Sequence, residues 1–216
     1  MNRFFTWGAF IVIVGLVIWG LVAAEKKADR EGASALLPDQ IVSTDHIRGS
    51  EAAAVTLVEY GDFQCPACAL YYPIVERLVS EYSSSTLRFV ARHFALSQHA
   101  NAMPAALAAE AADKQGKFWE MYGKLYDSQR DWENSKEAKN IFLGYARDLG
   151  LDEEKFLNDF DLPSSKEKIN NDYKSGLKAG VNSTPSFFVN GKKINNPQSY
   201  EDFKRIIDEA VSKAGK

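Results

Sequence analysis

The chain has 216 residues, of which 45% are hydrophobic and 25% are charged, and its formal net charge at pH 7 is -3. This length accommodates one sizeable globular domain with an additional segment, but it excludes two ordinary domains. The small negative charge excludes a broad basic surface of the kind that binds nucleic acid, so we expect no nucleic-acid partner.

The first residues differ in character from the rest of the chain. Residues 4–24 include no charged side chain, and a helix of that length reaches roughly 31 Å, the hydrocarbon thickness of a bilayer. We therefore predict one transmembrane helix, a signal anchor, at 1–24, followed by a polar tether at 25–45. A cleaved signal peptide is the alternative, since Val22-Ala23-Ala24 suits a cleavage site, although the apolar run is long for one. A buried core helix is disfavoured because the segment is apolar all round.

The remaining sequence predicts a series of strands and helices. Apolar and β-branched runs predict strands at 55–60, 86–94 and 186–189, and Asn190-Gly191 indicates a hairpin with a return strand from Lys193. Apolar residues at helical spacing predict helices from Pro66, throughout 101–160, at 164–178 and after Ser199. Within 101–160, Gly150 ends one helix and Asp152 caps the next. Residues 38–51 are expected to be irregular. This order predicts an α/β thioredoxin fold at 46–216, with a helical insertion at about 101–161.

The only two cysteines of the chain form the sequence Cys65-Pro66-Ala67-Cys68. A domain stabilised by disulfides would distribute several pairs along its length. Pro66 suits the first position of a helix, which places Cys65 beside unpaired backbone N–H groups that favour a thiolate. Cys68 lies on the same helical face, close enough to attack a mixed disulfide at Cys65. We predict that Cys65 is the attacking thiol and Cys68 the buried resolving thiol.

Three other interpretations of the cysteine pair are weaker. Half of a zinc site requires further ligands, and the spacing of the three histidines, His46, His93 and His99, is not that of a usual zinc motif. An inert disulfide here closes too small a loop to stabilise the fold much. Unreactive buried thiols fit poorly with a strand-to-helix turn. We expect no metal and no organic cofactor, and we interpret His93 and His99 as loop or packing residues.

Two segments resemble known functional motifs. Residues 58–68 resemble the active site of DsbA-family thiol–disulfide oxidoreductases, and residues 180–191 resemble the cis-proline loop and hairpin of that family. Two shorter segments, 92–94 and 116–119, support the resemblance, which extends from about residue 49 to the C-terminus. The likeness is strongest to the membrane-anchored or secreted bacterial members.

The resemblance implies roles for residues near the cysteines. It implies a cis peptide bond between Thr184 and Pro185, facing the cysteines, with the adjacent backbone pairing with a substrate peptide. An ordinary trans turn proline is the alternative. It also implies that Glu59 is a buried acid that moves a proton to or from Cys68, the alternative being an exposed carboxylate at a strand end.

The resemblance further implies that Phe63, Pro66 and Ala67 contribute to substrate binding, although Phe63 alternatively packs beneath the loop. Ala67 departs from the pattern, because DsbA has a histidine before its second cysteine. That histidine is implied to stabilise the thiolate. A Cys65 pKa near 5 instead of about 8.5 would favour the reduced form at pH 7 by roughly 2.7 kcal/mol, or about 60 mV, and Ala67 puts part of that effect in question.

Together these features predict a monomeric dithiol oxidase of the cell membrane, with its catalytic domain on the extracytoplasmic side. Its expected partners are reduced exported polypeptides and a quinone-linked oxidase in the membrane that reoxidises it. A disulfide reductase and a non-catalytic anchored peptide-binding module are the alternatives. A dimeric isomerase is disfavoured, because residues 25–54 are too few for a dimerisation domain.

Overall fold

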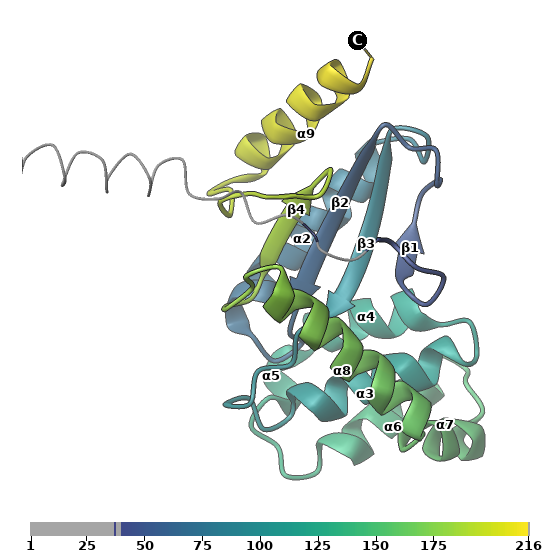
Figure 1. The fold of residues 1–216 in the computed structure, drawn as a ribbon. Helices are drawn as coiled ribbons and strands as arrows, with labels where there is room; N and C mark the ends of the chain where they lie inside the picture. The colour runs from purple at the N-terminus through teal and green to yellow at the C-terminus, as the bar shows by residue number, and fades with distance from the viewer. Residues whose placement is uncertain (1–36, 38–39, 216) are drawn as a thin grey trace, which may run out of the picture. The chain divides into compact units, whose positions relative to one another are not determined.

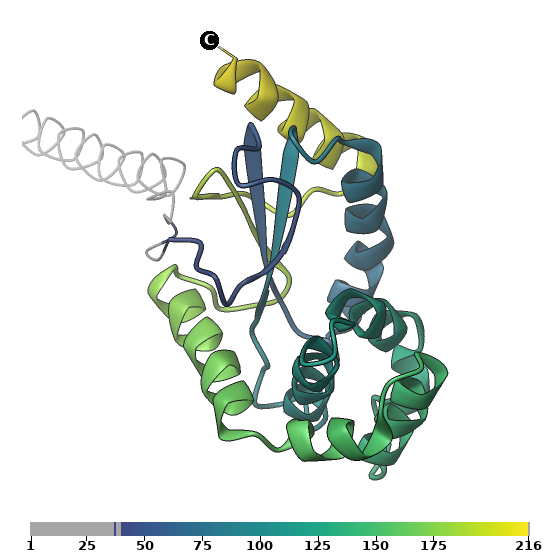
Figure 2. The same cartoon turned by 90° about the vertical axis from the view of Figure 1, so that its right-hand side faces the viewer.

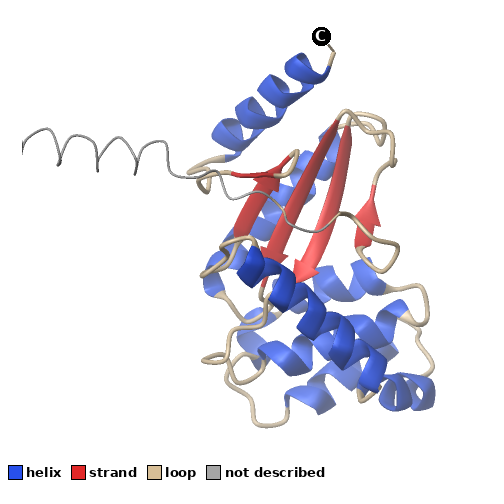
Figure 3. Ribbon diagram, in the orientation of Figure 1, coloured by secondary structure: helices blue, strands red, loops and turns tan. Residues whose placement is uncertain are grey.

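A mixed five-stranded sheet forms the centre of the domain (Figures 1 and 3). The computed structural model describes residue 37 and residues 40–215. The strands are β1 (His46–Arg48), β2 (Val55–Gly61), β3 (Leu87–His93), β4 (Ser186–Val189) and β5 (Lys192–Lys193), in the order β1-β3-β2-β4-β5. β2 and β3 are parallel, and the other neighbouring pairs are antiparallel. The predicted strands at 55–60, 86–94 and 186–189 correspond to β2, β3 and β4, and each predicted end lies within one residue of the observed end.

Three helices cover the two faces of this sheet (Figure 2). They are α2 (Pro66–Glu81) and α9 (Tyr200–Ala214) on one face and α8 (Pro163–Lys178) on the other. Successive side chains of a strand point to opposite faces. Leu57 of β2 accordingly belongs to the same buried cluster as Leu78 and Phe203, whereas Val58 belongs to the cluster of Ala179. Burial on both faces explains why β2 is almost continuously apolar.

The helical insertion lies beside the sheet end where β2 and β3 finish (Figure 1). Its helices are α3 (Ala102–Asp113), α4 (Phe118–Asp127), α5 (Gln129–Trp132), α6 (Ala138–Asp148) and α7 (Glu153–Phe160). The region 101–160 is helical as expected, and the predicted helix end at Gly150 and helix cap at Asp152 are confirmed. The break at Gly116 was not predicted. Gly116 and Gly150 adopt φ angles of 72° and 71°, which a helix cannot contain and which glycine tolerates best. The α/β thioredoxin fold with a helical insertion is confirmed.

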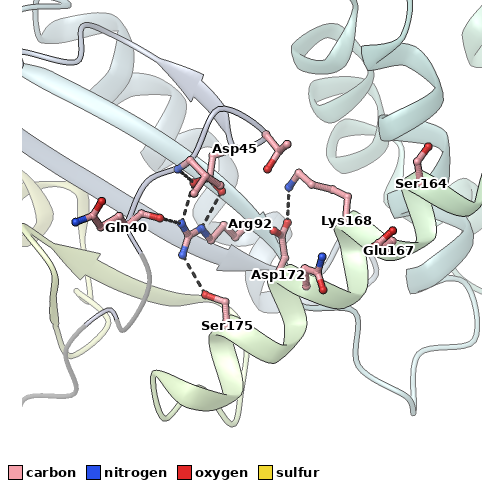
Figure 4. Close-up of a pocket in the computed structure, with 11 residues that line it drawn as sticks. Gln40, Asp45, Arg92, Ser164, Glu167, Lys168, Asp172 and Ser175 are labelled. Atoms are coloured by element: carbon pink, nitrogen blue, oxygen red, sulfur yellow. Dashed lines mark hydrogen bonds and ion pairs between the residues drawn. The ribbon is translucent and has the colours of Figure 1, made fainter.

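The segment before β2 is more regular than we expected. β1 pairs with β3, with His46 opposite Ala91, whereas the sequence indicated irregular structure. Three residues are too few to display a strand's alternation, which explains the error. Asp45, inside the predicted tether, is buried and forms an ion pair of 2.8 Å with Arg92 of β3, which also donates to the carbonyl of Gln40 (Figure 4). The chain thus packs on the domain before residue 46.

The predicted membrane anchor at 1–24 lies outside the described residues, as does most of the predicted tether. Among the helices of the described part, none combines the length and the apolar character that a bilayer crossing requires. The anchor therefore stays a prediction.

Candidate active site

The cysteine motif lies where β2 leads into α2. Cys65 is the residue that caps the helix, and Pro66 occupies its first turn, as predicted. Both cysteines are reduced thiols in this structure. The exposed fraction of Cys65 is 7%, whereas Cys68 is completely buried. The outer sulfur is therefore the one that another molecule can reach.

The environment of Cys65 stabilises its thiolate and lowers its pKa to about 5. The largest cause is a hydrogen bond from the Cys68 thiol, which outweighs the opposing effect of burial, and backbone N–H groups of Ala67 and Cys68 add to it. Thr184 has two opposing effects on the pKa of Cys65. Its hydroxyl, which has no other partner among the described residues, lowers the pKa, while its carbonyl oxygen accepts a 3.3 Å hydrogen bond from the thiol. The contacts from α2 dominate, so Cys65 is a thiolate at pH 7.

Cys68 and Glu59 have the opposite electrostatic environment. Burial, the hydrogen bond to Cys65 and the negative charges that Glu59 and Cys65 carry when ionised raise the pKa of Cys68 well above its usual value. Burial also raises the pKa of Glu59 to about 8, although a hydrogen bond of 3.2 Å from the Tyr122 hydroxyl opposes the shift. Both groups therefore hold a proton at pH 7. The exposed-carboxylate alternative for Glu59 is wrong, since only 3% of this residue is exposed.

The loop before β4 faces Cys65. The peptide bond between Thr184 and Pro185 is cis, as predicted. The carbonyl of Thr184 contacts Cys65, and the carbonyl of Pro185 accepts a 2.8 Å hydrogen bond from Asn196. The structure therefore brings together the cysteine motif and the cis-proline loop, whose contacting residues Cys65 and Thr184 are 119 residues apart in the sequence.

The three other predicted site residues differ in accessibility. Pro66 is exposed and Ala67 is half-buried at the start of α2, so both border the accessible side of the cysteine pair. Phe63 is only 4% exposed, and its ring packs against those of Tyr122 and Tyr126. This arrangement corrects the assignment of Phe63 to substrate binding, because its apolar ring is enclosed beneath the loop.

The sequence analysis missed polar side chains that fix the loop. The carboxylate of Asp62 accepts hydrogen bonds from the backbone of Gln64 and from the ring of His99, at 2.8 and 2.7 Å. Gln129 donates to the carbonyl of Cys65 at 3.1 Å. The Asp62 turn has a local signal, because aspartate commonly bonds the backbone two residues ahead. Gln129 is 64 residues from Cys65 and has no local signal.

One buried group in the described part of the chain has side chains of the types that bind metals: His46, His93 and Glu110. The Nε2 atoms of both histidines lie 2.6 and 2.8 Å from the same carboxylate oxygen of Glu110. These are hydrogen-bond distances, so we interpret this group, the His–Glu–His cluster, as a hydrogen-bonded network. His93 is thus a buried strand residue, in agreement with its interpretation as a packing residue.

A separate pocket of about 600 Å³ lies between residues 40–45 and α8 (Figure 4). Four of its charged side chains form two ion pairs: Arg92 pairs with Asp45, and Lys168 lies 2.6 Å from Asp172. Glu167 also lines the pocket. Paired charges have little capacity left for a charged ligand. We assign the ion pairs a structural role, holding the N-terminal segment and α8 against β3.

A family model described as Thioredoxin matches residues 42–209. The thioredoxin-like oxidoreductase from Silicibacter pomeroyi DSS-3 is 26% identical, with a TM-score of 0.68 over 84% of this chain and 98% of that protein. The chain belongs to the thioredoxin family, and it is similar to thioredoxin-like oxidoreductases. As in the family, its redox pair is Cys65 and Cys68, and the predicted family resemblance is confirmed.

Other solved structures share the DsbA-like fold. Wolbachia pipientis alpha-DsbA1 has a TM-score of 0.72 at 21% identity, covering 81% of this chain and 94% of that protein. Bacillus subtilis BdbD has the same TM-score at 23% identity, covering 83% of this chain and 99% of that protein.

Curated relatives include the Na(+)/H(+) antiporter NhaA of Herminiimonas arsenicoxydans, 37% identical over 202 residues, which are 92% of this chain and 31% of the antiporter. NhaA 1 of Mycolicibacterium gilvum is 39% identical over 167 residues, 76% of this chain and 26% of the antiporter. The chain thus spans less than a third of the length of these relatives.

The lowered pKa of Cys65 predicts its reactivity. The rate of alkylation by iodoacetamide should rise with pH around a midpoint near 5, because the thiolate is the nucleophile. Mass spectrometry of quenched samples gives this rate for the reduced protein. In Cys65→Ser, the remaining Cys68 should stay unmodified at pH 7, since it is buried and protonated. A midpoint near the ordinary value of about 8.5 would contradict the account.

The raised pKa of Glu59 predicts a pH-dependent stability change. Below pH 4.5 the Glu59 carboxyl group is protonated in both the folded and the unfolded protein. Between pH 4.5 and 8 it is protonated only in the folded protein, and taking up this proton on folding costs free energy. Glu59→Gln should therefore increase the free energy of unfolding by about 3 kcal/mol at pH 7 and by much less at pH 4. Urea denaturation at both pH values measures the difference. Glu120→Gln, at a largely exposed position, is the control, and an equal effect of Glu59→Gln at both pH values would refute the prediction.

Proposed function

We propose that this DsbA-like protein is an extracytoplasmic dithiol oxidase that introduces disulfides into exported polypeptides. The main support is the difference in protonation between the two cysteines at pH 7. Cys65, with a pKa of about 5, is a thiolate, whereas Cys68, whose pKa is raised well above its usual value, is a thiol. A stabilised thiolate favours the reduced pair, and a stable reduced state makes the disulfide a strong oxidant.

The exchange proceeds in two balanced steps. A thiolate of the polypeptide attacks the sulfur of Cys65, the Cys65–Cys68 bond breaks, and Cys68 takes up a proton. A second polypeptide thiolate then attacks the polypeptide's sulfur in the mixed disulfide, and Cys65 leaves as a stable thiolate. The polypeptide loses two electrons, and the cysteine pair gains them. In the reverse direction, Cys68 attacks Cys65 and resolves the mixed disulfide.

Three further residues have roles in this proposal. Glu59, protonated at pH 7, supplies the proton that Cys68 needs as it leaves. The backbone at Thr184 and Pro185 holds the polypeptide beside Cys65, because an extended segment can pair with backbone groups there. Pro66 and Ala67 form the accessible rim of the site.

The location and partners follow from the same proposal. A stable substrate disulfide requires an oxidising compartment, so the domain acts outside the cytoplasm, held to the membrane by the anchor at 1–24. A quinone-linked membrane oxidase reoxidises the pair, and the protein works as a monomer. One structural neighbour, from Salmonella enterica serovar Typhimurium, is described as periplasmic.

A reductase is the second candidate, because Ala67 replaces the histidine of DsbA. A peptide with two cysteines and a fluorescent reporter of its disulfide distinguishes the two directions. The oxidised protein should transfer one disulfide per molecule to the reduced peptide, and Cys65→Ser should transfer none. Transfer only from an oxidised peptide to the reduced protein would establish a reductase. Peptide binding without transfer in either direction would establish a binding module.

A further inference from the structure

The proposed chemistry leaves the His–Glu–His cluster without a role. The cluster joins three elements, since His46 lies on β1, His93 on β3 and Glu110 on α3. Their side chains are 7%, 6% and 4% exposed. Polar groups buried this deeply are costly unless they bond one another, and here both imidazoles bond one carboxylate.

The inner end of the cluster meets a small cavity that Glu59 also lines. The space inside it that the centre of a water molecule can occupy is about 10 Å³, which is close to what a single bound water needs. The cavity exists because β2 and β3 carry small residues here: Gly61 and Ala91 lie on the strand face that Glu59 and His93 share. A Cβ atom at Gly61 would lie 3.3 Å from the Oε1 atom of Glu59.

The outer end of the cluster reaches the surface. The Nδ1 atom of His46 lies 3.5 Å from the Oδ1 atom of Asp113, whose side chain is 40% exposed. The ring of Phe118 stacks on His46 with centroids 3.4 Å apart and covers that face. Polar groups thus run from the Glu59 cavity to Asp113, bounded by aromatic rings.

The redox cycle needs such a path. Reduction of the cysteine pair adds one proton to Cys68, and reoxidation removes it, while Cys65 remains a thiolate in the reduced form. Glu59 can donate this proton to Cys68. Because Glu59 is itself protonated at pH 7 in the reduced protein, it must then take up another proton from water. Glu59 and Cys68 are 3% and 0% exposed. One proton therefore crosses from solvent to this buried site in every cycle.

We propose that the His–Glu–His cluster, with one water in the Gly61 cavity, conducts protons between Asp113 at the surface and buried Glu59. In the inward direction, His46 gives its Nε2 proton to Glu110 and regains one at Nδ1 from the Asp113 side. Glu110 passes the proton to Nε2 of His93, which releases one from Nδ1 through the water to Glu59. The outward direction reverses each transfer.

In the resting cluster the proton lies on His46 and not on Glu110. Burial raises the pKa of Glu110, but the hydrogen bonds from both histidines outweigh it, and the pKa lies well below its usual value. Burial lowers the pKa of His46, but its bonds to Asp113 and Glu110 prevail and raise it. An imidazolium between two carboxylates can pass a proton from one ring nitrogen while it receives one at the other.

This inference rests on the proposed thiol–disulfide chemistry, in either direction, but its test requires no turnover. The test is the rate at which the Glu59 carboxylic acid exchanges its proton for deuterium. The reduced full-length protein, in EDTA at pH 6, is mixed rapidly into D2O, and time-resolved infrared absorption follows the carboxylic C=O band. Glu59→Gln identifies that band by removing it.

His93→Gln should slow the exchange by about tenfold or more, because glutamine keeps a polar side chain but cannot carry the proton. Gly61→Ala, which keeps all three cluster residues and fills the cavity, should also slow it. Ile207→Val, on the buried face of α9, is the matched control. A loosened fold admits water faster and accelerates exchange, so slower exchange cannot arise from destabilisation.

Exchange at the wild-type rate or faster in His93→Gln and in Gly61→Ala would overturn the proton path. That result would leave the oxidase proposal intact, because the disulfide-transfer assay tests it separately. Conversely, slowed exchange in a protein that transfers no disulfide would support the path and refute the oxidase.

Discussion

The hydrogen bond between the two cysteine sulfurs depends on a difference in burial that the fold imposes over a single helical turn. Cys65 caps α2 and meets backbone N–H groups, while Cys68 lies inside the core, where its thiol must stay protonated. The inner thiol can then donate to the outer thiolate. Each pKa shift supports the other, since a charged Cys65 opposes ionisation of Cys68.

The rest of the domain preserves this difference. The parallel strands β2 and β3 end together, which places the loop at 62–65 beside the helical insertion. Asp62 and Gln129 bind the backbone of that loop, and the cis-proline loop closes the other side of Cys65. Burial of Glu59 in the same core raises its pKa to about 8 and makes it a proton donor. Helices, loops and buried acid thus act on one pair of sulfur atoms.

Local signals in the sequence predicted much of this arrangement. Proline after Cys65 located the helix start, apolar and β-branched runs located the central strands, and Asn190-Gly191 located the hairpin. Features built from distant residues carried no such signal. The bond between His46 and Glu110 spans 64 residues, and β1 is too short to alternate. Within 101–160, glycine located the helix end at Gly150, whereas helix-forming composition concealed the turn at Gly116.

The equilibrium reduction potential of the Cys65–Cys68 pair tests the central claim most directly. It is measured in a series of glutathione buffers at pH 7, with the reduced and oxidised forms separated after alkylation. Because Cys65 is a stabilised thiolate even with Ala67 beside it, we predict a value near that of DsbA, about −120 mV. A value near that of thioredoxin, about −270 mV, would contradict the account and favour a reductase.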